Sequence, residues 1–451
     1  MSAKNTLKSI IKEFKLLVQL KGKAEDDDHN LISYCLRRSM SFRLPESAKT
    51  DRLIGFRVWR RMNQAIKRNQ NKAYIQGLGD AMIIQGVARN KERISEYISF
   101  QSQQTIPYFI AKDELPFQQQ KINASDKRAL QFFSLKTALQ CLFKKDRKNR
   151  ALWPWFCLEN WALSDFSARE NIKTAFDFAP YLIDANYYTK ALQQKKVTVF
   201  KVPSSGPLKA HNKYILGDVL VLSTPYQVME REKFKATIKV GKVEKWIPER
   251  ALEYIQQYQN PELPEPPQGS IGYYSHGGWL RKASGHADNG LNIHSAELQL
   301  MEDLSVWLRE AKDKELIIFL HPKEKSTDVI EQTKAFYQKH FGEFNYRFAD
   351  TNKATSEGFH LVDLGIAVYS TVLYERLFAG YKSIIGNYGM SDFPDPDASL
   401  SHICFQSKAA LDKALDEAFA ADRQGFFEKN GLLEYRFDTY EASFRIPKLL
   451  S

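Results

Sequence analysis

A histidine, a proline and a lysine follow an apolar run in ELIIFLHPKEK, residues 315–325. The apolar residues 316–320 predict a buried strand. His321 stands at the end of that strand, and Pro322 biases it away from helical backbone angles. A protonated imidazole here, with the Lys323 ammonium group, can stabilise the negative charge that grows on a leaving phosphate. The competing interpretation is a hydrogen-bonded histidine with only a structural role.

Hydroxyl groups and a carboxylate mark a second strand end. Residues 361–370 predict a strand and residues 371–380 a helix. Ser370 and Thr371 stand at the junction, where the free N–H groups of a helix start favour a phosphate. Glu375 follows one turn later, and its carboxylate can accept two hydroxyl hydrogen bonds from a ribose. The alternatives are a plain helix cap and a surface ion pair.

A third strand end carries glycines and polar donors in SIGYYSHGGWLR. Ser275 and Arg281 offer hydrogen-bond donors, and Gly277 and Gly278 allow a ligand to approach the backbone closely. Taken alone, the two glycines are also typical of a simple turn. Three strand ends with donors of this kind together indicate a site for the phosphate of a nucleotide.

Strands and helices alternate regularly around these positions. This spacing is typical of a parallel sheet that is covered on both faces. In such sheets ligands bind beyond the carboxyl ends of the strands. We expect strands at 270–275, 315–320, 344–349, 361–370 and 382–388, and helices at 293–312, 327–340, 371–380 and 407–420.

A proline-rich stretch, NPELPEPPQGS at 260–270, is typical of a stiff connector between domains. The chain has 451 residues, which exceeds one ordinary core and predicts two domains. We therefore expect an N-terminal domain over 1–262, a C-terminal domain over 268–430 and a tail over 431–451.

The part before this connector mixes strand and helix patterns. Short buried strands are expected at 181–188, 196–203 and 213–225. Residues 4–20 predict an amphipathic helix, which either packs on its own domain or lies on an anionic membrane surface. The basic stretch at 52–72 would support the second alternative. It lacks the regular aromatic residues of a nucleic-acid groove.

The composition is that of a folded protein with a basic balance. Hydrophobic residues make up 43% of the chain, and the formal net charge is +12. This charge suits nucleic acid, anionic lipid or phosphorylated substrates alike. The four cysteines show no CxxC and no metal-ligand spacing, which favours a reduced, cytoplasmic compartment and no metal site. No apolar run reaches the ~18 residues that span a bilayer, and no signal-peptide pattern opens the sequence.

The motifs carry a family resemblance. The C-terminal half, about residues 268–425, looks like the nucleotide-binding half of a two-domain, GT-B-type glycosyltransferase. The His-Pro pair at 321–322, and the Ser-Thr pair at 370–371 with Glu375 a turn later, resemble those of bacterial sialyltransferases, polysialyltransferases and capsule Kdo transferases. The stretch LGIAVYSTVLYERLFAGYKSIIGN also looks like the matching region of surface-polysaccharide and teichoic-acid-type transferases.

The resemblance implies a fold and an activity. The fold would be α/β and GT-B-like, with two Rossmann-like domains facing a cleft and extra helices in the N-terminal domain. The enzyme would move a sugar from a nucleotide-activated, CMP-linked donor to a surface polysaccharide or glycolipid, without metal or cofactor. Residues 1–262 would form the acceptor side and 268–430 the nucleotide-sugar side.

Roles for individual residues follow from the same resemblance. His321 would assist departure of the nucleotide phosphate, Ser370 and Thr371 would bind that phosphate, and Glu375 would hold the ribose. The other donor-site candidates are Ser275, Gly277, Gly278, Arg281 and Lys323.

The general base is open. The polysialyltransferases carry an acidic-acidic-Gly motif in the N-terminal domain, and this sequence has none before the connector. Asp184 and Asp288 are the candidate catalytic carboxylates, and Asp218 is a third carboxylate of this kind. Two other functions are also open: transfer of a polyol phosphate from a CDP-linked donor, and non-catalytic binding to membrane or nucleic acid. For the transferase we expect no nucleic-acid partner, and we expect a cytoplasmic protein with the inner-membrane surface as a further candidate partner.

Overall fold

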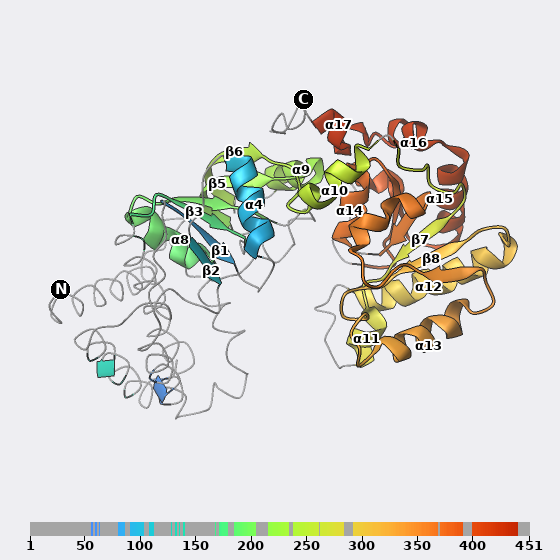
Figure 1. Ribbon diagram of the computed structural model, residues 1–451, viewed down its shortest axis with the longest axis horizontal. Coiled ribbons are helices and arrows are strands. Elements are labelled where there is room, and N and C mark those ends of the chain that lie inside the picture. Colours follow the sequence, from blue (N-terminus) through green and yellow to red (C-terminus); the bar gives the residue numbers. More distant parts are fainter. Residues whose placement is uncertain are drawn as a thin grey trace. The chain divides into compact units, whose positions relative to one another are not determined.

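A computed structural model of the chain contains two compact units (Figure 1). It describes residues 80–85, 91–102, 108–111, 171–178, 185–203, 215–233, 238–260, 262–283, 292–368, 370–390 and 399–440, with single positions between 56 and 167. The helix expected at 4–20 and most of the basic stretch at 52–72 lie outside these residues. Among the helices described, none is both long and apolar enough to cross a bilayer.

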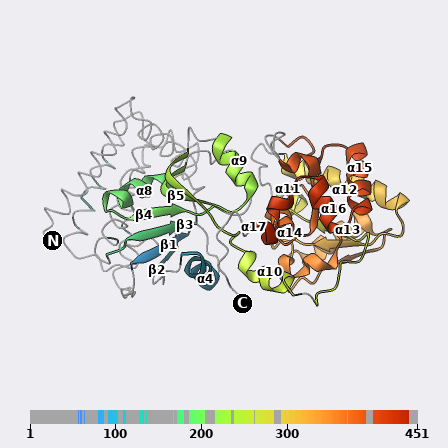
Figure 2. The same cartoon turned by 90° about the horizontal axis from the view of Figure 1, so that it is seen from above.

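The first unit is built on a six-stranded sheet with the strand order β2-β1-β3-β4-β5-β6. Neighbouring strands from β2 to β5 pair in parallel, and Figure 2 shows them side by side in that order. Its elements are β1 (Ala81–Gln85), α4 (Lys91–Ser102), β2 (Tyr108–Ala111), β3 (Thr174–Asp177), α8 (Ala185–Gln194), β4 (Thr198–Lys201), β5 (Ile215–Leu222) and β6 (Ile238–Lys245). Helix α9 (Pro225–Lys233) follows β5 in the sequence, and most of it belongs to the second unit.

One strand expected in this unit is a helix. The predicted strand at 181–188 overlaps α8, whereas 196–203 and 213–225 contain β4 and β5 as expected. The helical period becomes clear only further along the chain, where Leu192 joins Tyr188 against the apolar face of the sheet. A window that ends at residue 188 contains too few turns to distinguish a helix from a strand.

The second unit is built on a six-stranded sheet with the order β12-β11-β10-β7-β8-β9. All five pairs are parallel, and the order is that of the doubly wound dinucleotide-binding fold. Its elements are α10 (Ala251–Tyr258), β7 (Ile271–Tyr274), α11 (Gly278–Ala283), α12 (Ile293–Glu310), β8 (Leu316–Phe319), α13 (Ile330–Phe341), β9 (Tyr346–Phe348), η3 (Thr355–Leu361), β10 (Leu364–Ala367), α14 (Thr371–Phe378), β11 (Lys382–Gly386), η4 (Ser399–Ile403), β12 (Cys404–Phe405), α15 (Lys408–Ala420), α16 (Arg423–Lys429), η5 (Leu433–Tyr435) and α17 (Phe437–Tyr440).

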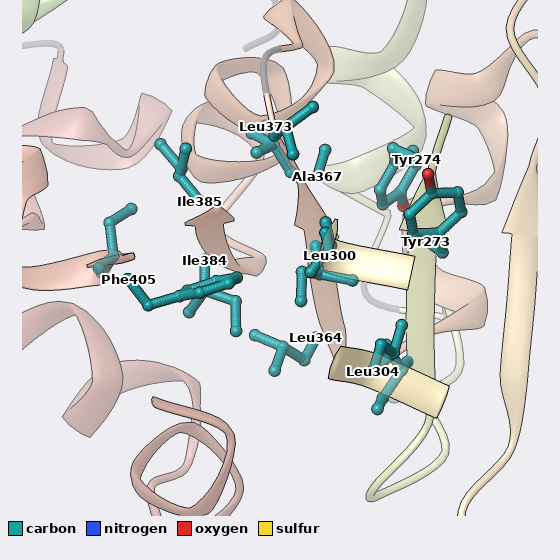
Figure 3. Close-up of a cluster of buried hydrophobic side chains, with 14 of the residues drawn as sticks. Tyr273, Tyr274, Leu300, Leu304, Leu364, Ala367, Leu373, Ile384, Ile385 and Phe405 are labelled. Carbon is teal, nitrogen blue, oxygen red and sulfur yellow. The ribbon is translucent and has the colours of Figure 1, made fainter. Parts of the chain in front are cut away.

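Two adjacent tyrosines show how this sheet is covered. Successive side chains of a strand point to opposite faces. Tyr273 contacts Tyr337 and Phe341 of α13, whereas Tyr274 stacks on Phe319 and accepts a hydrogen bond from Arg376 of α14. Helices therefore cover both faces, and the core between them is drawn in Figure 3. The expected α/β class with two Rossmann-like domains is confirmed by the two parallel sheets.

The division between the units differs from the one expected at 260–270. It falls at the end of β6, between Glu244 and Lys245, and residues 223–230 also belong to the second unit. The reason is α10, which packs on the second unit through Tyr254 and Tyr258. The proline-rich stretch thus connects α10 to β7 inside that unit.

Part of the tail expected at 431–451 packs into the second unit. Leu432 and Tyr435 are fully or almost fully buried and belong to the core of the second unit. Their side chains contribute to the same apolar cluster as the strands, so the domain extends past its expected end at residue 430.

Candidate functional site

The three strand ends singled out in the sequence lie side by side. Strand β7 lies between β8 and β10, with Tyr274 level with Phe319 and Tyr273 level with Ile366. The carboxyl ends of these strands are therefore at one edge of the sheet, and they carry Ser275, His321 and Ser370 beyond them. The order of the strands reverses between β7 and β10, which is where doubly wound sheets bind ligands. We call this edge the strand-end site.

Cationic and imidazole side chains gather at this site. A guanidinium nitrogen of Arg281, on α11, lies 3.4 Å from Nε2 of His321. The rings of His276 and His321 are 6.0 Å apart and approach edge to face. Lys323 is exposed beside them, and its charge acts on His321. The sequence-predicted Arg281, His321 and Lys323 are thus brought together.

His321 is neutral rather than protonated. Burial, and then the charges of Arg281 and Lys323, lower the pKa of the imidazole from 6.5 to about 4. Nδ1 accepts a hydrogen bond from the backbone N–H of Lys323 at 3.2 Å, which leaves the ring proton on Nε2. Nε2–H then faces another donor, the Arg281 guanidinium group 3.4 Å away, so these two groups share no hydrogen bond and both can donate to an anion. The protonated imidazole expected from the sequence is corrected to a neutral ring that donates through Nε2–H.

Arg281 has an unused donor at the same place. Its Nε is shielded from solvent and has no hydrogen-bond acceptor among the described residues. A buried donor without a partner loses its hydration and gains nothing in return. An anion at the strand-end site would supply the missing acceptor.

The start of α14 has the geometry expected for a helix cap. Ser370 Oγ accepts a hydrogen bond from the backbone N–H of Val372 at 3.3 Å, and Thr371 opens the helix with a half-buried side chain. Glu375 is only 2% exposed. The role predicted for Glu375 at a ribose therefore requires a ligand that reaches beneath the surface of the unit.

The loop with the two glycines after β7 binds a buried carboxylate of the protein, that of Glu297. Glu297 of α12 accepts hydrogen bonds from the backbone N–H groups of His276, at 2.6 Å, and Gly278, at 2.5 Å. A Cβ on Gly278 would overlap Glu297 Oε2 and would lie 3.1 Å from the Cα atom of His294. Gly277 has φ +69°, which favours glycine in this turn. The close approach that Gly278 permits is that of Glu297 rather than that of a ligand phosphate.

We expect Gly278→Ala to destabilise the second unit by about 1 to 3 kcal/mol, because the new methyl group forces Glu297 away from the loop. Chemical denaturation measures this cost. In a double-mutant cycle with Glu297→Gln the cost should change, since the two residues are in contact. Additive costs for the two substitutions would show that the methyl group is accommodated without moving Glu297.

Sequence reasoning missed Glu297 and Glu324. Both are buried, and Glu324 accepts hydrogen bonds from the backbone N–H of His321, at 2.8 Å, and from Trp279 Nε1, at 2.6 Å. A signal for Glu297 was present, because it falls four residues after Ile293 on the apolar stripe of its helix. Glu324 stands between two lysines just after the strand, and no local pattern there indicates that it is buried.

A small pocket opens beside the strand-end site. It has a volume of about 110 Å³ and lies at the carboxyl ends of β8 and β9, under η3. Its lining includes the apolar Leu320 and Leu361 and the polar Asp350, Glu357 and His360. Burial is the main cause that lowers the pKa of the His360 imidazole, and the charge of Lys353 lowers it further.

Two candidate catalytic carboxylates cannot be placed. Asp184 and Asp288 lie outside the described residues. Asp218, on β5, accepts hydrogen bonds from the backbone N–H of Val199, at 2.7 Å, and from Gln193, at 2.9 Å. It therefore ties β4 and α8 to β5. In the described ranges no three His, Cys, Asp or Glu side chains gather closely enough to hold a metal ion.

Comparison with known proteins finds likeness in structure alone. No family model matches the sequence, and no curated protein does. A UDP complex of MnaA from S. aureus is 11% identical, with a TM-score of 0.45, covering 80% of this chain and 93% of the other. UDP-GlcNAc 2-epimerase from Methanocaldococcus jannaschii has 11% identity and a TM-score of 0.44 over 77% and 95% of the two chains. MurG from Acinetobacter baumannii has 11% sequence identity and a TM-score of 0.42, and the match covers 78% of this chain and 94% of the other.

Proposed function

We propose that this chain is a nucleotide-sugar-dependent glycosyltransferase of the GT-B type, and that the phosphate of its donor binds at the strand-end site. The observation that carries the proposal is the group formed by Arg281, Lys323 and His321 at the point where the strand order reverses. The shielded Nε of Arg281 needs an acceptor, and a phosphate oxygen is one.

The chemistry follows from these groups. The bond between the sugar and the donor phosphate breaks, and its electron pair goes to a phosphate oxygen. The Nε2–H of His321 donates a hydrogen bond to that oxygen, and Arg281 and Lys323 stabilise its charge. The acceptor hydroxyl forms the new bond to the sugar and gives its proton to a base, for which Asp184 and Asp288 remain candidates.

The nucleoside has two neighbouring places to occupy. The pocket under η3 offers apolar and polar lining residues for a base, and the start of α14 offers Ser370, Thr371 and Glu375. We propose a CMP-linked donor, and a surface polysaccharide or glycolipid as the acceptor, on the resemblance of the motifs alone.

A screen of donor hydrolysis over CMP-, UDP-, GDP- and CDP-linked compounds tests the activity. Turnover of a sugar-linked donor supports the proposal, and turnover of a CDP-linked polyol alone favours the polyol phosphate transferase. No turnover and no nucleotide binding with any donor would remove the proposal.

We expect Arg281→Met to weaken binding of CMP by about tenfold to a hundredfold, because a charge-assisted hydrogen bond contributes about 1.5 to 3 kcal/mol. Binding of cytidine should be unchanged, since it has no phosphate. Arg309→Met is the matched control, because Arg309 is an exposed arginine that pairs only with Glu343 in the described structure. Calorimetry of the wild type and both variants measures this. Equal losses for CMP and cytidine would place the phosphate elsewhere.

A further inference from the structure

Two buried glutamates lie directly beneath the strand-end site. Glu297 is 2% exposed and Glu324 is fully buried. Glu297 holds the loop after β7 through the N–H groups of His276 and Gly278. Glu324 holds the next strand end through the N–H of His321. Each carboxyl group thus fixes one of the loops that carry the site.

Two hydroxyl groups connect these glutamates. Glu297 Oε1 lies 3.3 Å from Ser275 Oγ, and Ser275 Oγ lies 2.8 Å from the hydroxyl of Tyr337. That hydroxyl lies 3.1 Å from Glu324 Oε1. The result is a continuous chain of oxygens, Glu297–Ser275–Tyr337–Glu324, inside the domain. We call it the carboxyl chain.

The carboxyl chain needs one proton more than its hydroxyl groups supply. Its three oxygen–oxygen contacts require three protons if each is a hydrogen bond. Ser275 and Tyr337 contribute one each. The third can come only from a carboxyl group, so all three contacts are hydrogen bonds at once only when one of the two glutamates is protonated. Either end can carry this proton, and the two hydroxyl groups then point the opposite way.

The surroundings of the two glutamates also favour protonation of one of them. Burial is the main cause that raises the pKa of Glu297 to about 7, and it also raises the pKa of Glu324. Two like charges in a buried site cannot both form readily. The other groups that face the pair are Tyr273, Trp279 and the backbone N–H groups already named. The adjoining elements also carry titratable or charged groups, namely His276, His294, His321, Arg281 and Lys323.

We propose that Glu297 and Glu324 share one proton along the carboxyl chain, and that this shared proton sets the positions and the electrostatic environment of His321 and the loop after β7. Sharing the proton is a property of the folded chain alone. Its effect on nucleotide binding rests on the proposed function.

Infrared spectroscopy tests the proton directly. A protonated carboxyl group absorbs at a different infrared frequency from an ionised one. A ¹³C label on the glutamate carboxyl groups assigns the band to glutamic acid. We expect the wild type at about pH 6 to show one buried protonated glutamic acid. Glu297→Gln and Glu324→Gln should each abolish it, because an amide donates at one end and leaves the other glutamate ionised. Glu343→Gln, at an exposed position, is the control and should keep the signal.

The two single variants together decide the proposal. If only one of them abolishes the signal, the proton belongs to that glutamate alone and is not shared. If the wild type shows no protonated glutamic acid at any pH between about 5 and 7, the carboxyl chain does not hold a proton.

Stability against pH gives a second measurement. A folded pKa above the unfolded value means that the folded chain binds the extra proton, so its stability is full below the unfolded value of 4.5 and falls as pH rises to about 7. We expect this fall in the wild type and in Glu343→Gln. It should be smaller in either buried variant. An unchanged slope in both buried variants would contradict the proposal.

Nucleotide affinity tests the positioning role. At about pH 8 the wild type has lost the shared proton and carries an extra negative charge beneath the phosphate, whereas Glu324→Gln does not. We expect the ratio of their dissociation constants for CMP to be near one at about pH 6 and to rise by about threefold to tenfold at about pH 8. A constant ratio would overturn the positioning role. Absence of CMP binding at every pH would count against the proposed function, while the infrared result would still decide the proton.

Discussion

Replacing Arg376 by Met is expected to lower the free energy of unfolding of the second unit by about 3 kcal/mol or more. For a domain of this size the melting temperature should fall on the order of 10 °C. Arg376 lies on α14 and is fully buried. Its loss would leave buried carbonyl groups without a donor, which is among the costliest single changes in a protein interior.

The contacts of Arg376 explain why the expected loss of unfolding free energy is so large. One terminal nitrogen donates to the Tyr274 hydroxyl at 2.9 Å and to the Phe359 carbonyl at 2.8 Å. The other donates to the Val362 and Lys382 carbonyls, each at 3.3 Å. The side chain therefore links α14 to η3, β7 and β11. A methyl group on Gly365 would lie 2.5 Å from Arg376 Nε, so the strand beneath has no room for a larger residue.

Thermal melting with hydrogen exchange of the β7 and β10 amides measures the effect in the second unit. Arg281→Met is the matched control, since Arg281 is half-buried at the strand-end site and donates to no carbonyl in the described structure. It should melt near the wild type and lose CMP affinity. Melting of both variants at the wild-type temperature would show that the buried guanidinium group contributes little.

The strands of the second sheet could be predicted because burial on both faces produces short apolar runs. Ile271–Tyr274, Leu316–Phe319 and Leu364–Ala367 are buried at every position, and a polar residue follows each within three positions. Parallel strands covered by helices need this composition. The sequence therefore placed the strand ends, and with them Ser275, His321 and Ser370, on one edge.

The strand β3 shows what a local pattern misses. Its sequence, TAFD, ends in Asp177, a residue type that is rare in strands. Asp177 is tolerated because Lys201 lies opposite it on β4, and their charged groups are 2.7 Å apart with neither side chain exposed. This pairing joins residues from two separate segments, so no window of the sequence contains it.

The protonation state of the site could not be predicted for the same reason, since it depends on residues from separate segments of the chain. The sequence suggested a cation at His321 because a solvated imidazole, with a pKa of 6.5, takes up a proton close to neutral pH. In the folded chain burial lowers this pKa, and Arg281, brought next to the ring from another strand end, lowers it further. Glu297 likewise reaches Gly278 from α12. The residue types at the site were predictable from their spacing, whereas their charges depend on neighbours that only the folded chain supplies.

The last prediction concerns His321 itself. We expect His321→Ala to lower kcat/KM for the donor by about 10² to 10³, the usual loss when one donor to a developing oxyanion is removed. The melting temperature should change by only a few degrees, because the imidazole gives up one exposed hydrogen bond from the Lys323 N–H. His340→Ala on α13 is the control, and its turnover should equal that of the wild type.

A second substitution separates hydrogen-bond donation from proton transfer. His321→Gln keeps an N–H donor near the place of Nε2 but cannot carry a proton between groups. Since the neutral ring acts through Nε2–H, this variant should recover part of the lost turnover, about tenfold over His321→Ala.

The titration of the ring gives the sign of the pH dependence. A folded pKa of about 4, below the ordinary 6.5, means that the unfolded chain binds the proton more readily. His321 thus lowers stability as pH falls from 6.5 toward 4, and this dependence should be absent from His321→Ala. NMR of the histidine rings should show one resonance, missing in that variant, that titrates near pH 4. A midpoint near 6.5, with equal turnover of the Ala and Gln variants, would mean that His321 acts as a cation rather than as a neutral donor.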